Sequence, residues 1–226
     1  QSQINDFVIL EKTNDVGGTW RENQYPCAAC DVQSHMYSLS FAPKTDWSKR
    51  YAEADEIFTY IQDITEQYKL KDYCKFNHEV THAQFDENRN VWTVEFKDQP
   101  TLEAQFVIFA SGPLHVPQIP HIKGIEKFKG KVFHSSKWEH DYDLNGKSVA
   151  SIGTGGSAIQ YIPEIAPEVK QLYVFQRTAA WVIPRDERKY SQLSKSLFKA
   201  SNIYRQIHRT RLYWSNESRV VPIVQP

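Results

Sequence analysis

Residues 148–178 read SVASIGTGGSAIQYIPEIAPEVKQLYVFQRT, and this stretch decides the expected fold. An apolar run leads into a glycine cluster, a helical pattern follows from about Ser157, and a second apolar run starts at Gln171. A strand, a glycine turn, a helix and a second strand form a βαβ unit, in which the two strands lie parallel. The sequence therefore predicts an α/β chain.

The glycine cluster of this unit predicts a dinucleotide site. It matches the pattern G-x-G-x-x-A, in which the first glycine permits a tight turn and the second lets the backbone approach a pyrophosphate. The small third residue lets helix and strand pack closely, and the phosphates would lie on the amides at the helix N-terminus. The residues that we expect to contact this nucleotide are Thr154, Gly155, Gly156, Ser157, Ala158 and Gln160.

The end of the second strand predicts which nucleotide binds. About 20 residues after the glycines, a site for NAD carries an acidic residue that accepts from the ribose hydroxyls. This chain has Arg177 followed by Thr178 at that place. A guanidinium and a hydroxyl are good donors to a 2′-phosphate, so we expect NADPH. A surface arginine at a strand end is the plain alternative.

A second nucleotide site is predicted near the N-terminus, where residues 6–20 read DFVILEKTNDVGGTW. The apolar run Phe7–Leu10 predicts a buried parallel strand. It ends in Glu11, whose carboxylate can accept from both ribose hydroxyls of an adenine dinucleotide. The double glycine that follows lets the backbone pass close to a flat ring, and Trp20 adds an aromatic wall.

Hydrophobic periodicity predicts the other elements. Residues 53–68 have the spacing of an amphipathic helix, and residues 75–98 alternate like an antiparallel hairpin around a polar turn. Residues 104–112, AQFVIFASG, read as another buried strand, and the polar, basic stretch after Pro184 reads as one or two helices.

Composition limits the partners. The chain has 226 residues with 27 Lys+Arg against 27 Asp+Glu, and this balance argues against a nucleic-acid or membrane partner. No stretch approaches the ~18 to 20 apolar residues of a membrane helix. Three cysteines and the absence of a signal-peptide pattern indicate a cytoplasmic protein, and we expect no metal site.

A fingerprint ahead of the βαβ unit resembles that of the flavin-dependent Baeyer–Villiger monooxygenases. Residues 128–138 read FKGKVFHSSKW and match F-x-G-x-x-x-H-x-x-x-W. The matching residues are Phe128, Gly130, His134 and Trp138, and Glu139 stands where the family has Pro or Asp. The resemblance runs from about residue 4 to about residue 190 and includes residues 25–41, YPCAACDVQSHMYSLSF.

The resemblance implies an α/β fold with two Rossmann-like dinucleotide-binding units, for FAD and NADP, in a three-layer sandwich with an antiparallel hairpin insertion. It divides the chain into a partial FAD-binding domain (1–113), a linker with the fingerprint (114–146), an NADP-binding unit (147–190) and the start of a helical segment (191–226). The family's first G-x-G-x-x-G turn and its catalytic arginine have no counterpart here. We therefore expect an internal fragment of a longer protein.

The resemblance also implies the activity. In this family NADPH reduces FAD, and the reduced flavin takes up O₂ as a C4a-peroxyflavin. This species inserts oxygen into ketones to give esters or lactones, or oxidises sulfides or amines. We expect a small ketone or sulfide as substrate, and the sequence selects none among them.

Residue by residue, the resemblance implies a set of FAD contacts, which are Glu11, Gly18, Thr19, Trp20, Asp31, Tyr37 and Val80. Asp31 is also the expected catalytic residue, because the family's aspartate orients the catalytic arginine. A cap of the following turn is the alternative for Asp31. For His134, packing of the linker is favoured over proton transfer.

Two other functions stay open. Cys27 and Cys30 form a C-x-x-C pair, as in flavin disulfide reductases, although those enzymes have a cysteine directly after Gly-Gly-Thr, where this chain has Trp20. Cys27 also replaces a glycine of the monooxygenase family, so a positive φ there would be strained. The other possibility is that the chain alone is non-catalytic and binds at most NADP.

Overall fold

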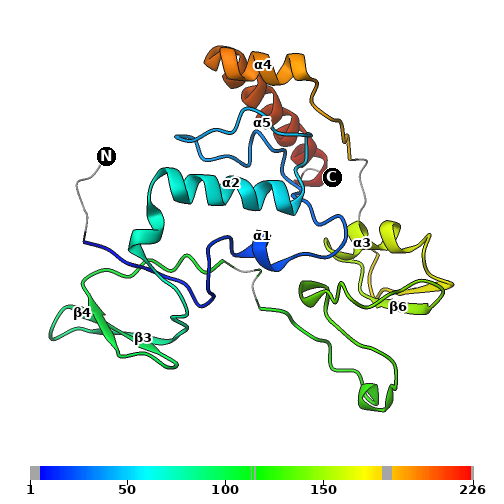
Figure 1. The fold of residues 1–226 in the computed structure, drawn as a ribbon, viewed down its shortest axis with the longest axis horizontal. Helices are drawn as coiled ribbons and strands as arrows, with labels where there is room; N and C mark the ends of the chain where they lie inside the picture. The colour runs from blue at the N-terminus through cyan, green and yellow to red at the C-terminus, as the bar shows by residue number, and fades with distance from the viewer. Residues whose placement is uncertain (1–5, 113, 115, 180–184, 225–226) are drawn as a thin grey trace. The chain divides into compact units, whose positions relative to one another are not determined.

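The computed structural model describes residues 6–112, 114, 116–179 and 185–224 (Figure 1). The chain divides into two compact units. The first unit comprises residues 1–22 and 58–120, and the second comprises residues 23–57 and 121–226. Residues 23–57, which the sequence analysis places in the FAD-binding range, thus group with the predicted βαβ unit.

The first unit contains two small sheets. Strand β1 (Ile9–Leu10) pairs in parallel with β2 (Cys74–Lys75), which follows a short 3₁₀ helix at Leu70–Tyr73. The second sheet is antiparallel, with the order β3 (Val80–Asp86), β4 (Val91–Phe96) and β5 (Leu102–Ala104). The hairpin predicted for residues 75–98 is therefore present, and β5 extends it (Figure 1).

The first unit also contains one short helix and the larger part of a second helix, whose residues 54–57 belong to the second unit. The single-turn helix α1 (Thr19–Glu22) follows the double glycine. Helix α2 (Ala54–Gln67) matches the predicted helix at 53–68 within one residue at each end. Its apolar positions Ile57, Tyr60 and Ile64 are buried, as the i, i+3, i+7 spacing requires of the face that packs against the core.

The second unit contains the predicted βαβ unit. Strand β6 (Ser148–Ile152), helix α3 (Ala158–Ile165) and strand β7 (Gln171–Phe175) follow one another. The strands are parallel, and their register runs from Ser148 opposite Gln171 to Ile152 opposite Phe175. The linker before β6 has two 3₁₀ turns, Ile125–Lys127 and Ser135–Lys137.

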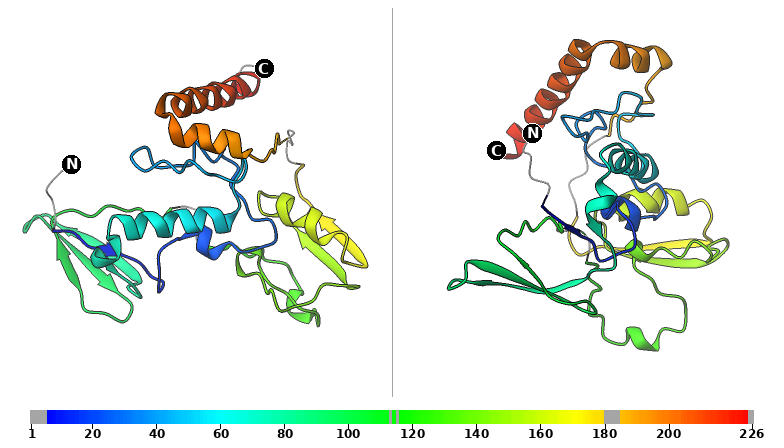
Figure 2. Two further views of the ribbon diagram at one scale, coloured as in Figure 1. Left: turned by 45° about the horizontal axis from the view of Figure 1, so that its top comes forward. Right: turned by 60° about the vertical axis from the view of Figure 1, so that its left-hand side comes forward.

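The second unit ends in two helices, α4 (Gln192–Ala200) and α5 (Asn202–Val224), which pack against each other (Figure 2). The side chain of Ser191 caps α4 by accepting from the Ser194 amide at 3.2 Å. Phe198 of α4 is buried against His35 and Tyr190. Among the described residues, no helix is both long and apolar enough to cross a bilayer.

The structure corrects two strand predictions. Residues 104–112 form a strand only at their start, in β5, and Phe106, Ile108 and Phe109 are 69% to 89% exposed. A strand requires a neighbour for its backbone hydrogen bonds, and none of the described residues pairs with 106–109. The predicted strand Phe7–Leu10 shrinks to β1, which is parallel as expected, but Ile9 is exposed.

Candidate functional site

The glycine turn between β6 and α3 is open. Gly153 has φ +101°, a backbone conformation that favours glycine, and its amide donates to the Phe175 carbonyl at 2.8 Å. A Cβ atom built on Gly153 or on Gly155 would meet no atom within 4 Å. The space beside the turn is thus free, and the turn leads into the N-terminus of an eight-residue helix. This arrangement fits a pyrophosphate group.

The residues near the glycine turn differ in how far they are exposed to solvent. Ala158 is buried, so it takes the place of the small third residue of the pattern. Thr154 and Ser157 are half-buried, and Arg177 and Thr178 are exposed directly after β7. The guanidinium and the hydroxyl that the sequence analysis assigns to a 2′-phosphate are therefore accessible to a ligand.

Gln160, on the first turn of α3, holds the segment that contains the two cysteines. Its Oε1 accepts from the Ala29 amide at 3.0 Å and from the Tyr25 hydroxyl at 3.2 Å. Its Nε2 donates to the Ala29 carbonyl at 3.1 Å and to Asp31 Oδ1 at 3.2 Å.

Asp31, the predicted catalytic residue, lies beside the glycine turn. Its Oδ2 is 3.9 Å from the position that a Cβ atom would take on Gly156. Its Oδ1 is 3.8 Å from Arg185 Nη1, and its side chain is 68% exposed. The structure thus brings together Asp31 and the predicted nucleotide residues of α3 within one unit.

The fingerprint residues pack the linker. The ring of Phe128 covers Gly130, because a Cβ atom there would lie 2.5 Å from the ring. His134 caps the 3₁₀ turn at Ser135–Lys137, where its Nδ1 accepts from the Ser136 amide at 3.2 Å. The Trp138 ring lies 5.2 Å from the Tyr161 ring of α3. These contacts give the fingerprint a structural role in joining the linker to α3.

The predicted FAD contacts belong to both units. In the first unit, Glu11 Oε1 accepts from the Thr13 amide at 2.9 Å and from the Thr13 hydroxyl at 2.8 Å. Gly18 has φ +48°, with open space where a Cβ atom would lie. Thr19 and Trp20 start α1, and Val80 starts β3. Tyr37, which is exposed, belongs with Asp31 to the second unit.

The two cysteines of the C-x-x-C pair are free thiols. Desolvation and a hydrogen bond to Glu164 raise the pKa of the Cys27 thiol above its ordinary value. Desolvation by burial likewise raises the pKa of Cys30. Reactive cysteines have lowered pKa values, so both shifts argue against a redox dithiol. Cys27 also has φ +55°, the strained conformation that the sequence analysis anticipates.

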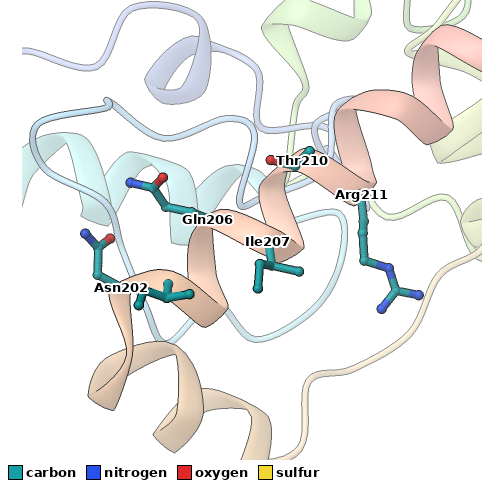
Figure 3. A pocket seen from close by; sticks show the side chains of 6 residues that line it. Asn202, Gln206, Ile207, Thr210 and Arg211 are labelled. Carbon is teal, nitrogen blue, oxygen red and sulfur yellow. The ribbon is translucent and has the colours of Figure 1, made fainter.

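One surface groove comes from a single helix. A groove of about 490 Å³ runs along α5, and all of its lining residues come from that one helix, so it is not an enclosed ligand site (Figure 3). The lining residues are Asn202, Ile203, Gln206, Ile207, Thr210 and Arg211. Within the described part of the chain, no group of three or more His, Cys, Asp or Glu side chains is placed to hold a metal.

Sequence reasoning missed Arg185. Its Nη2 donates to the Cys30 carbonyl at 3.1 Å, and its guanidinium lies 4.5 Å from the centre of the Tyr51 ring. No local pattern marks this residue, because its partner lies 155 positions earlier in the chain. The spacing of apolar residues carries no information on such a contact.

Comparison with known proteins identifies the family. Residues 5–212 match the flavin-binding monooxygenase-like family. A Baeyer–Villiger monooxygenase of Streptomyces coelicolor is 44% identical over 96% of this chain, and one of Pseudomonas aeruginosa is 42% identical over 98%. The chain spans 42% of the length of each of these two relatives.

Solved structures agree with these relatives. An oxidised steroid monooxygenase bound to NADP is 38% identical, with a TM-score of 0.78, over 84% of this chain and 38% of its own. A complex of OTEMO with FAD and NADP is 34% identical, also with a TM-score of 0.78, over 85% of this chain and 39% of its own. The resemblance inferred from the fingerprint is confirmed: the chain belongs to the flavin-binding monooxygenase-like family, and its relatives include Baeyer–Villiger monooxygenases.

Proposed function

We propose that this chain is the nucleotide-handling part of an NADPH- and O₂-dependent flavoprotein monooxygenase. The reaction would insert oxygen into a small ketone, giving an ester or a lactone, or would oxidise a sulfide or an amine. The observation that carries the proposal is the open glycine turn at α3, with Arg177 exposed after β7, in a chain whose relatives are Baeyer–Villiger monooxygenases.

The architecture in this proposal is a pair of Rossmann-like units in a three-layer sandwich. The FAD unit would draw on residues 1–113, the linker on 114–146, the NADP unit on 147–190 and a helical segment on 191–226. The parallel pairs β1–β2 and β6–β7, with the antiparallel sheet β3–β4–β5 between them in sequence, support this arrangement.

The residues present fit NADPH and the ribose of FAD. The backbone amides at the start of α3 would hold the pyrophosphate of NADPH, and Arg177 and Thr178 its 2′-phosphate. Glu11, which uses one carboxylate oxygen for Thr13, would accept from the ribose of FAD. When bound, NADPH supplies a hydride to the flavin, and the reduced flavin activates O₂. Asp31 contributes a carboxylate beside the nucleotide turn.

The test follows flavin retention and reduction. The chain is incubated with FAD, passed through gel filtration and mixed with NADPH under air, and its flavin absorbance is recorded. The proposal expects the chain to bind NADP⁺, and flavin that stays bound, bleaches with NADPH and recovers in O₂ would show that the chain alone also carries out the flavin half-reactions. Product analysis with a panel of ketones and sulfides then identifies the substrate. Loss of FAD with retained NADP⁺ binding would support the alternative of a non-catalytic NADP-binding module.

A further inference from the structure

The backbone of Ala28–Cys30 is buried and fully paired. These three residues are 5% to 9% exposed, so an unpaired polar group would be costly there. On one side the partners are backbone groups. The Ala54 amide donates to the Ala28 carbonyl at 2.8 Å, and the Cys30 amide donates to the Ala52 carbonyl at 3.0 Å. The Ala28 amide donates to the Tyr25 carbonyl at 3.0 Å.

On the other side the partners are two side chains. The Oε1 atom of Gln160 accepts a hydrogen bond from the Ala29 amide, and its Nε2 donates one to the Ala29 carbonyl. A neighbouring β-strand would pair with Ala29 in the same way. Arg185 Nη2 donates to the Cys30 carbonyl. All six backbone groups from Ala28 to Cys30 therefore have partners, and three of the six depend on Gln160 and Arg185.

The amide of Gln160 has no hydrogen-bonding capacity left. A primary amide offers two donors and an oxygen with two lone pairs. Ala29 and Tyr25 take the two lone pairs, while Ala29 and Asp31 take the two donors. A Gln160 side chain engaged in this way cannot also bind a nucleotide, although its position in the glycine pattern predicts a nucleotide contact.

Arg185 approaches the same segment from another part of the chain. The face of Tyr51 orients its guanidinium, which lies 4.5 Å from the ring centre. From there it reaches the Cys30 carbonyl and comes within 3.8 Å of Asp31 Oδ1. Asp31 directly follows this fixed backbone, so its carboxylate is held next to Gly156.

We propose that Gln160 and Arg185 are positioning residues that hold the backbone of Ala29 and Cys30 and thereby set the Asp31 carboxylate beside the glycine turn. This inference rests on the proposed function, because it requires a nucleotide to bind at the glycine turn. It gives Gln160 a different role from Arg177. Gln160 acts through Asp31, while Arg177 contacts the ligand itself.

The test compares the chain with its Gln160→Met variant, which keeps the length of the side chain and removes the amide. The control is Gln171→Met, at an exposed glutamine that starts β7. Hydrogen exchange of the Ala29 amide reports on the backbone of the segment. The carboxyl-carbon NMR signal of Asp31 and the amide signal of Gly156 are followed during titration with NADP⁺.

The proposal expects the Ala29 amide to exchange about tenfold faster or more in Gln160→Met, and at the unchanged rate in Gln171→Met. In the unaltered chain both the Asp31 and the Gly156 signals shift with NADP⁺. In Gln160→Met the Gly156 signal still shifts and the Asp31 signal no longer does. If Gln160 had a purely structural role, the substitution would change only the exchange rate of the Ala29 amide.

Other results overturn the proposal. Unchanged Ala29 exchange in Gln160→Met, or an Asp31 response equal to that of the unaltered chain, would show that Gln160 does not position the segment. If the Gly156 signal of the unaltered chain does not shift on addition of NADP⁺, the proposal that a nucleotide binds at the glycine turn is wrong. The Ala29 exchange rate then still decides whether Gln160 holds the backbone.

Discussion

At the scale of single residues, Cys27 occupies a backbone conformation that favours glycine. Its φ of +55° costs a non-glycine residue roughly 1–2 kcal/mol. A glycine at this position would avoid the cost of the positive φ, but it would lose more chain entropy on folding, which offsets part of the stabilisation. We expect Cys27→Gly to raise the free energy of unfolding by about 1 kcal/mol. Urea unfolding followed by circular dichroism measures the change.

The matched control is the same substitution at an extended position. Cys74 has φ −88°, so Cys74→Gly should lower the stability of the chain. A Cys27→Gly variant that unfolds at lower urea than the unaltered chain would contradict the strain argument.

In the proposed function, the choice of nucleotide depends on Arg177. Removing a charge-assisted hydrogen bond to a phosphate costs about 1.5–3 kcal/mol, or roughly tenfold to a hundredfold in affinity. We expect Arg177→Ala to weaken NADP⁺ binding by that factor and to leave NAD⁺ binding unchanged, as measured by titration calorimetry. Lys170→Ala, an exposed cation before the opposite end of β7, should change neither affinity. An equal loss for both nucleotides would place Arg177 away from the 2′-phosphate.

At the scale of elements, helices α4 and α5 cover a buried histidine. His35 is 2% exposed, and its Nε2 has no hydrogen-bond partner among the described residues. Desolvation, followed by the charges of His208, Arg209 and Arg205, lowers the pKa of His35 to about 3. Desolvation also lowers the pKa of His208, whose ring lies 5.1 Å from that of His35.

The lowered pKa gives a pH dependence with a definite sign. The unfolded state takes up a proton near pH 6.5, while the folded state does so only near pH 3. The contribution of neutral His35 to stability is therefore fully present above pH 6.5. It falls as the pH drops toward 3, by up to about tenfold in the folding equilibrium per pH unit.

Unfolding experiments between pH 7 and about pH 4 measure this slope. The variant His35→Phe should have a shallower slope than the unaltered chain, because it removes one titrating group. His121→Phe, at an exposed histidine, is the control and should keep the slope. Equal slopes for His35→Phe and the unaltered chain would show that His35 is not buried in its neutral form.

Sequence patterns predicted the elements where local spacing decides the structure. The helix at 54–67, the hairpin β3–β4 and the βαβ unit all have such patterns. The failures depend on distant partners. Strand β2 has two residues and exists because β1 lies beside it, and residues 106–109 have no pairing strand among the described residues.

The candidate site divides in the same way. The glycine turn and Arg177 follow from the local pattern, and the structure leaves both accessible. The roles of Gln160 and Arg185 depend on contacts across 131 and 155 positions, respectively, and no short-range signal encodes them. Sequence reasoning predicted Gln160 as a nucleotide contact, whereas the structure engages its amide with protein groups.

At the scale of the whole molecule, the division into two units predicts where a ligand acts. NADP⁺ stabilises the unit that binds it by about 2.7 kcal/mol at a hundredfold excess over Kd. All of the predicted NADP residues lie in the second unit. We therefore expect hydrogen exchange to slow in residues 147–178 when NADP⁺ is added.

The sheet β3–β4–β5 serves as the internal control for this experiment. It belongs to the first unit, and its exchange should not change with NADP⁺. Protection that appears in this sheet and not in residues 147–178 would contradict the assignment of the nucleotide to the βαβ unit.

The contact between the Phe128 ring and Gly130 bears on what the first part of the fingerprint can identify. A side chain at Gly130 would meet the outer atoms of that ring, which is 62% exposed and would have to turn away to make room. The F-x-G pair therefore describes a packing contact of the linker, and that contact involves neither cofactor nor substrate. The pair alone thus carries no information on whether a chain that contains it is an enzyme.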